Sequence, residues 1–423
     1  MPTSPQDTLR PLPDRPNLRH LKAQAKDLLK AGRADSLTHA QFQIARLYGF
    51  ASWPKLKAHV DSLESIGQLK QAIDADNNDR AKTLLASNPE LHRAPLGYAE
   101  DGPLTLVAEC RIPWGPPSPE RLALAKWMIE NGSDVHQGGD GPLMRAALNS
   151  VRIPMMELLV SYGAHVNAAW HGTYPIIFAP CETLDPGSLK WLLEKGADPN
   201  CSNAENWSGA NNPHPGTALD YVIGSYVRNP EILSSCIQIL LEAGGTTKYS
   251  TPAVLAILRG DLNELAEEID LDPALTSRHF PELEFGTTGG RMLMLKGATL
   301  LHVAAEYGQC EAARLLLDSG ADVNARATIG DSGIGGQTAI FHAATQFDDK
   351  GLPIAQLLIE RSADLSVRAR LPGHYERPGE VVLSCLSWKW RERSAVKITG
   401  RTHEEATEAL QRRRESRHSE AAF

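Results

Sequence analysis

The sequence predicts an all-α fold: a solenoid of helix-turn-helix repeats behind a small helical N-terminal unit. Three observations support this prediction. The chain has 423 residues, of which 42% are hydrophobic, so a large core can be buried. Apolar residues recur at helical spacing along most of the chain. A glycine-containing turn follows most of the second helices, and such a recurring unit is typical of a repeat array.

Residues 1–64 form the predicted N-terminal unit. We expect its first ~15 residues to be disordered, as chain ends often are. Three helices are predicted in the remainder. A capping box of Thr38 and Gln41 opens the second helix, and Ser52 caps the third.

The clearest repeat covers residues 297–326, GATLLHVAAEYGQCEAARLLLDSGADVNAR. Thr299 caps its first helix, Gly308 ends that helix, and Gly320 ends the second. Asp322 and Asn324 suit the turn that follows. This pattern resembles an ankyrin repeat, which implies a stack of paired helices with a concave side.

Weaker copies of the pattern extend the predicted array over residues 65–370, as about eight helix pairs. The run YGFASWPKLKAHV within residues 48–60 resembles a short helical module that precedes ankyrin arrays in bacterial proteins.

Residues 371–423 depart from the family. They form either a degenerate terminal repeat that caps the stack or a divergent charged tail, and both alternatives stay open.

The glycine-rich stretch GDSGIGGQT, residues 330–338, lies between two repeats. A phosphate-binding loop needs a lysine where Gly336 stands. The GDSG string resembles the surroundings of the nucleophile in trypsin-like enzymes, but that fold needs two β-barrels and not helical repeats. We therefore predict a finger between repeats, with no catalytic role for Ser332.

Two histidines occur in repeat openings, His302 after Thr299 and His342 after Thr338. We interpret them as occupying matching slots. The resemblance implies that the ankyrin histidine bonds to backbone of its own and the adjacent turn, so both are assigned structural roles. The six cysteines are far apart and form no metal-ligand spacing. No metal and no cofactor is predicted.

Four insertions interrupt the repeats, and insertions in solenoids often fall on the binding face. The third, residues 281–295, reads as a β-hairpin. Aromatic side chains in the insertions are candidates for partner contacts. The residues predicted to contact a partner are Trp114, Trp207, His214, Ser332 and Ile334.

Charge narrows the choice of partner. Residues 65–388 carry 24 basic against 39 acidic residues, which disfavours nucleic acid at the array and favours a neutral or basic protein. No apolar run is long enough for a membrane span, and the N-terminus lacks an apolar signal segment. We expect a cytoplasmic monomer.

The predicted function is a non-enzymatic scaffold for protein–protein interaction. One alternative is a regulator in which residues 17–64 contact nucleic acid while the array senses a protein. A second is an enzyme within the insertions, although no acid-base pair or nucleophile constellation is recognisable there.

Overall fold

A computed structural model shows the chain as two compact units. Unit 1 consists of Met1–Arg145 with Glu157–Gly163, and unit 2 consists of Ala146–Met156 with Ala164–Phe423. The structure describes residues 9–13, 16–109, 115–202, 216–225, 229–283, 293–331, 333–344, 346, 350–371 and, for the backbone alone, 381–384.

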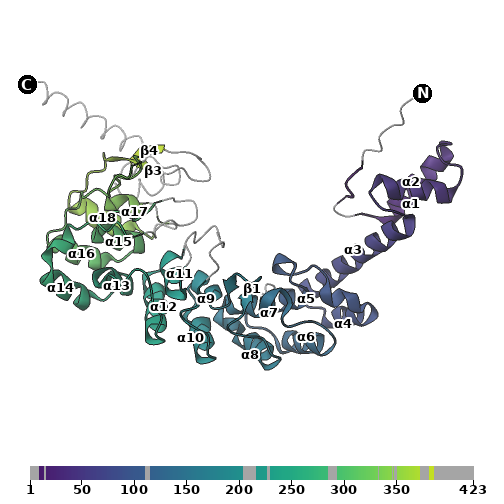
Figure 1. The fold of residues 1–423 in the computed structure, drawn as a ribbon, viewed down its shortest axis with the longest axis horizontal. Coiled ribbons are helices and arrows are strands. Elements are labelled where there is room, and N and C mark those ends of the chain that lie inside the picture. Colours follow the sequence, from purple (N-terminus) through teal and green to yellow (C-terminus); the bar gives the residue numbers. More distant parts are fainter. Residues whose placement is uncertain are drawn as a thin grey trace, which may run out of the picture. The chain divides into compact units, whose positions relative to one another are not determined.

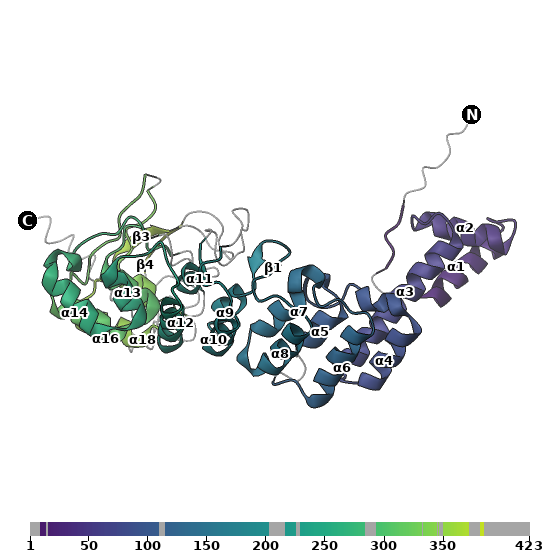
Figure 2. The same cartoon turned by 60° about the horizontal axis from the view of Figure 1, so that its bottom comes forward.

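Unit 1 begins with three helices, α1 (Leu18–Lys30), α2 (Leu37–Leu47) and α3 (Trp53–Asp74). α1 and α2 lie side by side, and the start of α3 packs on both (Figures 1 and 2). Apolar positions at helical spacing meet in one core between them. The buried members of this core are Leu21, Ala25, Ala34, Ala40, Ile44, Ala45, Leu56 and Val60.

One helix cap of this unit differs from the sequence prediction, and another agrees with it. The predicted Thr38 capping box is wrong: Ser36 is the N-cap of α2, and its Oγ accepts the His39 N–H over 3.1 Å. α3 continues without a break through the boundary predicted at residue 64. The Ser52 cap of α3 is confirmed, since its side chain accepts the Lys55 N–H.

Paired helices make up most of the other described residues of both units. Most begin at an Asn, Asp, Ser or Thr cap, often with proline in the first turn, which supplies acceptors for the free N–H groups. After α3 the pairs continue with α4 (Asn78–Ser87), α5 (Pro103–Ala108) and α6 (Pro119–Glu130), α7 (Gln137–Ala147) and α8 (Ile153–Ser161), α9 (Phe178–Thr183) and α10 (Pro186–Glu194), α11 (Ala218–Gly224) and α12 (Pro230–Glu242), α13 (Pro252–Arg259) and α14 (Leu262–Leu271), α15 (Leu300–Tyr307) and α16 (Cys310–Asp318), and α17 (Ala339–Ala344) and α18 (Leu352–Glu360).

The last three pairs of unit 2 form two layers. α13, α15 and α17 pack on one another in sequence, and α14, α16 and α18 form the second row (Figure 1). Short helices of mostly small and apolar residues, such as LLHVAAEY in α15, allow this close approach. The predicted all-α class of stacked helix pairs is confirmed.

Short strands occur between α8 and α9 and after α18. β1 (Ala169–Trp170) pairs antiparallel with β2 (Tyr174–Pro175), and β3 (Arg368–Leu371) pairs antiparallel with β4 (Val381–Ser384). Most of the predicted hairpin at residues 281–295 and most of the tail at 371–423 lie outside the described residues. None of the helices in the described ranges is both long and apolar enough to cross a lipid bilayer.

Candidate interaction surface

His302 is buried in α15 and joins two repeats. The Thr299 N–H donates to its Nδ1 over 3.2 Å, and its Nε2 lies 3.1 Å from the Gln337 carbonyl oxygen. Nδ1 therefore accepts and Nε2 donates, as in a neutral ring. Burial, and to a lesser extent the adjacent His342, lowers the pKa of His302 to about 3. The ring links the turns of two repeats and is not suited to proton transfer near neutral pH.

A second buried contact joins α15 to α17. Nδ1 of His342 lies 2.8 Å from Oε2 of Glu306, and both side chains are 0% exposed. The interpretation that His342 occupies the slot of His302 is wrong. His342 is the fourth residue of its helix and His302 the third of its own, a rotation of about 100° around the helix axis. His342 therefore contacts Glu306 and does not repeat the contact of His302 with its capping threonine.

The finger, residues 327–337, is held by backbone hydrogen bonds. The Ala327 N–H donates to the Gln337 carbonyl over 2.8 Å, and the Gly335 N–H donates to the Arg370 carbonyl over 2.7 Å. Gly335 has φ +126°, and a methyl group there would lie 2.3 Å from the carbonyl oxygen of Thr328. Glycine is therefore required at this crossing. The described part of the finger presents Ile329, which is 57% exposed.

Asparagine side chains link successive turns within unit 2. Nδ2 of Asn324 donates to the Ser362 carbonyl over 3.3 Å, and its Oδ1 accepts the Asp364 N–H over 2.7 Å. One amide thus supplies both a donor and an acceptor to the next repeat. These two hydrogen bonds fix the distance between the turn after α16 and the turn after α18. The same bridging is made by Asn167 and Asn200.

Unit 1 contains a charged pair at equivalent repeat positions. Glu109 comes six residues after Pro103, as Glu306 comes six after the first residue of α15. Arg145 comes three residues after Pro142, as His342 comes three after the first residue of α17. Nε of Arg145 lies 3.3 Å from Oε1 of Glu109. The same two positions therefore carry a contact between consecutive repeats in both units, glutamate with histidine in unit 2 and glutamate with arginine in unit 1.

The unit 1 pair differs because it supports an aromatic side chain. Oε1 of Glu109 accepts the Tyr98 N–H over 3.0 Å. The guanidinium carbon of Arg145 lies 4.2 Å from the centre of the Tyr98 ring, a cation–π contact. Tyr98 is nevertheless 46% exposed. Backbone and ring are thus both held while part of the ring faces solvent.

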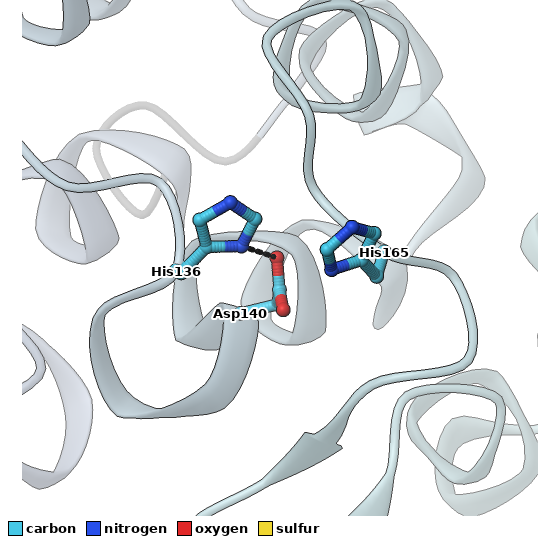
Figure 3. Close-up of side chains that lie close together, drawn as sticks. All are labelled: His136, Asp140 and His165. Carbon is cyan, nitrogen blue, oxygen red and sulfur yellow. Dashed lines mark hydrogen bonds and ion pairs between the residues drawn. The ribbon is translucent and has the colours of Figure 1, made fainter.

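Two turns near Tyr98 have unusual backbone geometry. Ala99 and Glu100 have φ of +52° and +63°, and Asp140 has φ of +60°. Such angles are costly for residues other than glycine. Nδ1 of His136 lies 3.0 Å from Oδ1 of Asp140, which helps to hold the second turn (Figure 3). His165, also drawn there, belongs to unit 2.

The thiols of the described residues are poorly suited to nucleophilic chemistry. Burial raises the pKa of Cys201 and of Cys236 to about 12. Burial also raises the pKa of Cys181 well above its usual value. A thiol with such a pKa stays protonated near neutral pH, and only the thiolate is a good nucleophile.

The predicted partner residues fall mostly outside the described ranges. Trp114, Trp207, His214 and Ser332 lie there. Ile334 is described, half-buried in the finger, and its carbonyl accepts the Gly330 N–H over 2.9 Å.

The predicted structural positions are all described. Thr299 is the N-cap of α15, and Gly308 is its C-cap with φ +73°. Gly320 has φ +93° after α16. Oδ1 of Asp322 accepts the Asn324 N–H over 2.8 Å. Thr338 is buried directly before α17.

Sequence reasoning missed Tyr98, Glu109, Arg145 and Glu306. A usable signal existed for the two glutamates, since both stand at the same place in the openings DGPLTLVAE and ATLLHVAAE. An acidic residue on the apolar stripe of a short helix indicates a buried partner.

Comparison with known proteins identifies the repeat type. A family model of ankyrin repeats, comprising three copies, matches residues 291–369. This segment contains the repeat that the sequence alone marks most clearly, and it includes α15 to α18 and the finger. Residues 291–369 are therefore ankyrin repeats.

Matches to individual proteins are partial. Neurogenic locus notch homolog protein 2 from human and from mouse is 33% identical over 120 residues, which is 28% of this chain and 4% of those proteins. The human ASB11 ankyrin repeat domain, a crystal structure, covers 62% of this chain and 99% of its own, with a TM-score of 0.35 and 19% identity. The chain thus spans only a small part of its notch relatives.

Proposed function

We propose that this chain is a non-enzymatic scaffold that binds a protein partner through its ankyrin repeats. Ankyrin-type solenoids generally use extended surfaces across several repeats for such contacts. The finger is the observation that carries the proposal. Its backbone is bonded on both sides, and it presents Ile329 at 57% exposure. An apolar side chain on an ordered loop loses little conformational entropy on binding.

The nature of the partner follows from charge. The excess of acidic residues between 65 and 388 supports a neutral or basic protein partner and opposes nucleic acid at the array. We further propose that the chain acts as a monomer in a bacterial cytoplasm, away from membranes and without a cofactor. These proposals rest on composition and on the resemblance of the N-terminal run YGFASWPKLKAHV to a bacterial module.

Affinity capture with the full chain tests the scaffold. Ile329→Ser should lose the captured partner, because it removes an apolar contact without disturbing the finger backbone. Leu271→Ser is the matched control, since Leu271 is 81% exposed at the end of α14. Mass spectrometry that finds no protein enriched by the wild-type chain over the bead control would contradict the scaffold proposal.

Trp207 offers a second variant for the same experiment. As an aromatic residue in the insertion at 202–215, it is proposed to anchor the partner. Trp207→Ala should weaken binding by more than about 1 kcal/mol. The helical circular dichroism spectrum should be unchanged. Normal binding by this variant would remove the insertion from the interface.

A second candidate function concerns the N-terminal unit. Lys22, Lys26 and Lys30 are exposed on α1 at intervals of four residues, so they lie along one face. This stripe favours contact with a phosphate backbone. If the unit binds DNA, Lys22→Glu with Lys26→Glu should abolish binding, and wild-type affinity should fall steeply with salt. Absence of DNA binding at low salt would exclude this function.

A further inference from the structure

We infer that the Tyr98 platform, defined as residues 97–102 and 136–141, docks a lysine- or arginine-bearing segment of a partner against the Tyr98 ring. The inference deepens the proposed scaffold function and rests on it. All residues of the platform belong to unit 1. The finger of unit 2 is not involved.

The first argument is that Tyr98 is presented in a fixed position. Its N–H is held by Oε1 of Glu109 at 3.0 Å, and its ring is backed by the guanidinium of Arg145 at 4.2 Å. Glu109 itself is buried, so this support is not easily displaced by solvent. A partly exposed aromatic side chain that is already ordered loses little entropy when a partner contacts it. Such residues commonly dominate binding energies.

The second argument is that the surrounding turn is specified in detail. Left-handed backbone at Ala99 and Glu100 is unfavourable for residues that carry a side chain, and surrounding contacts must hold it. Asp101, which is buried, packs against the second turn so closely that a methyl group at Gly138 would lie 2.3 Å from its Oδ1. Gly97 is equally constrained, since a methyl group there would lie 2.9 Å from the Gly102 carbonyl oxygen. The strained shape is therefore maintained by packing between the two turns.

The third argument is charge. Within residues 97–109 and 134–145 there are five carboxylates and one guanidinium, that of Arg145, besides the imidazole of His136. Two of the carboxylates, Glu100 and Asp134, are on exposed residues. This imbalance attracts cationic groups and repels acidic peptides and nucleic-acid phosphates. The five carboxylates are those of Glu100, Asp101, Glu109, Asp134 and Asp140.

The Tyr98 ring is the point on this acidic surface that a cationic side chain would contact. The Arg145 contact shows that the ring already accepts a guanidinium at cation–π distance. A lysine or arginine from a partner would meet the exposed part of the same ring, with Glu100 following two residues later. Ring and carboxylate together favour a basic side chain over a neutral one.

A peptide titration with the full chain tests the inference. The probe is a fluorescein-labelled peptide of alternating glycine and lysine, and the comparison peptides replace lysine with glutamate or serine. Fluorescence anisotropy should show binding of the lysine peptide alone. Tyr98→Ala should weaken that binding by about 5-fold, whereas Tyr98→Phe should retain it because the ring is kept.

Tyr162→Ala serves as the matched control, since Tyr162 is another tyrosine of unit 1, bonded to Glu130 through its hydroxyl. Its affinity for the lysine peptide should equal that of the wild type. Equal affinity of Tyr98→Ala and wild type would overturn the inference, as would equal binding of all three peptides or no binding of the lysine peptide. The scaffold proposal is judged separately, by whether affinity capture enriches a partner.

Discussion

Two regions of the molecule use the same repeat positions in different ways. In unit 2, Glu306 and His342 meet with both side chains at 0% exposure. In unit 1, the equivalent Glu109 is 1% exposed, while Arg145 is 14% exposed and lies beneath the exposed ring of Tyr98. A contact of a glutamate with the next repeat can therefore be fully buried inside the stack or can support a surface residue. We infer that loss of the first arrangement affects stability and that loss of the second affects binding at Tyr98.

The largest expected effect is on the sealed pair. Glu306→Ala empties a fully buried position and leaves Nδ1 of His342 without the carboxylate, which should together cost about 3–5 kcal/mol of unfolding free energy. Glu109→Ala should cost less, about 1–3 kcal/mol, because the Arg145 side chain is 14% exposed, whereas that of His342 is 0% exposed. Urea unfolding monitored by circular dichroism measures both. Equal losses would show that the two contacts do not differ in the way described.

Apolar packing in the same repeat provides the next test. Leu316 in α16 is fully buried, so Leu316→Ala should destabilise the chain by about 2–5 kcal/mol. Leu271→Ala is the matched control at an exposed position and should cost less than about 1 kcal/mol. Urea unfolding again supplies the values. A loss below about 1 kcal/mol for the Leu316 variant would mean that the helix face is assigned wrongly.

The stability of the repeat that contains His302 should also depend on pH. The pKa of His302 is about 3 in the folded chain, against 6.5 for an ordinary histidine. The unfolded state therefore binds the extra proton between these values, and stability is full above pH 6.5 and falls as the pH drops toward 3. The slope from this one group is at most about 1.4 kcal/mol per pH unit.

The variant His302→Gln isolates this contribution. It lacks the titrating group, so its unfolding free energy should vary less with pH between 6.5 and 3 than that of the wild type. Unfolding free energies measured across this range provide the comparison. Identical pH profiles for the two chains would remove His302 as a source of acid sensitivity.

The smallest expected effect concerns the finger. Ser332→Ala should leave stability unchanged and remove no chemical reactivity, because no catalytic role is assigned to this serine. Treatment of the wild-type chain with a fluorophosphonate probe, followed by mass spectrometry, checks the chemistry. Covalent labelling at Ser332 would show a reactive nucleophile and would contradict the non-enzymatic proposal.

The sequence predicts well those features that depend on neighbouring residues. Thr299, Gly308 and Gly320 mark the ends of helices because caps and left-handed turns are local properties. Even so, Ser36 and not Thr38 caps α2. Two cap residues stand close together in this run, and a local pattern does not choose between them.

Features that depend on contacts between repeats were not predictable in the same way. Glu306 and His342 are 36 residues apart, and a shift of one position on α17 decides which way the histidine points. The positive φ angles of Ala99 and Glu100 are held by Asp101 and Glu109 through tertiary contacts. The residue types do not predict these positive φ angles, because neither alanine nor glutamate favours left-handed backbone.

One experiment tests directly whether Glu306 acts on stability alone while Tyr98 acts on binding. The lysine peptide is titrated by anisotropy into the full chain carrying Glu306→Ala or Tyr98→Ala, at a temperature where both remain folded. We predict that Glu306→Ala binds within about 2-fold of wild type, because Glu306 belongs to unit 2 and shares no contact with the Tyr98 platform of unit 1 in the bonds described above, and that Tyr98→Ala binds about 5-fold more weakly. Equal weakening by both variants, or unchanged binding by Tyr98→Ala, would contradict this difference between the two residues.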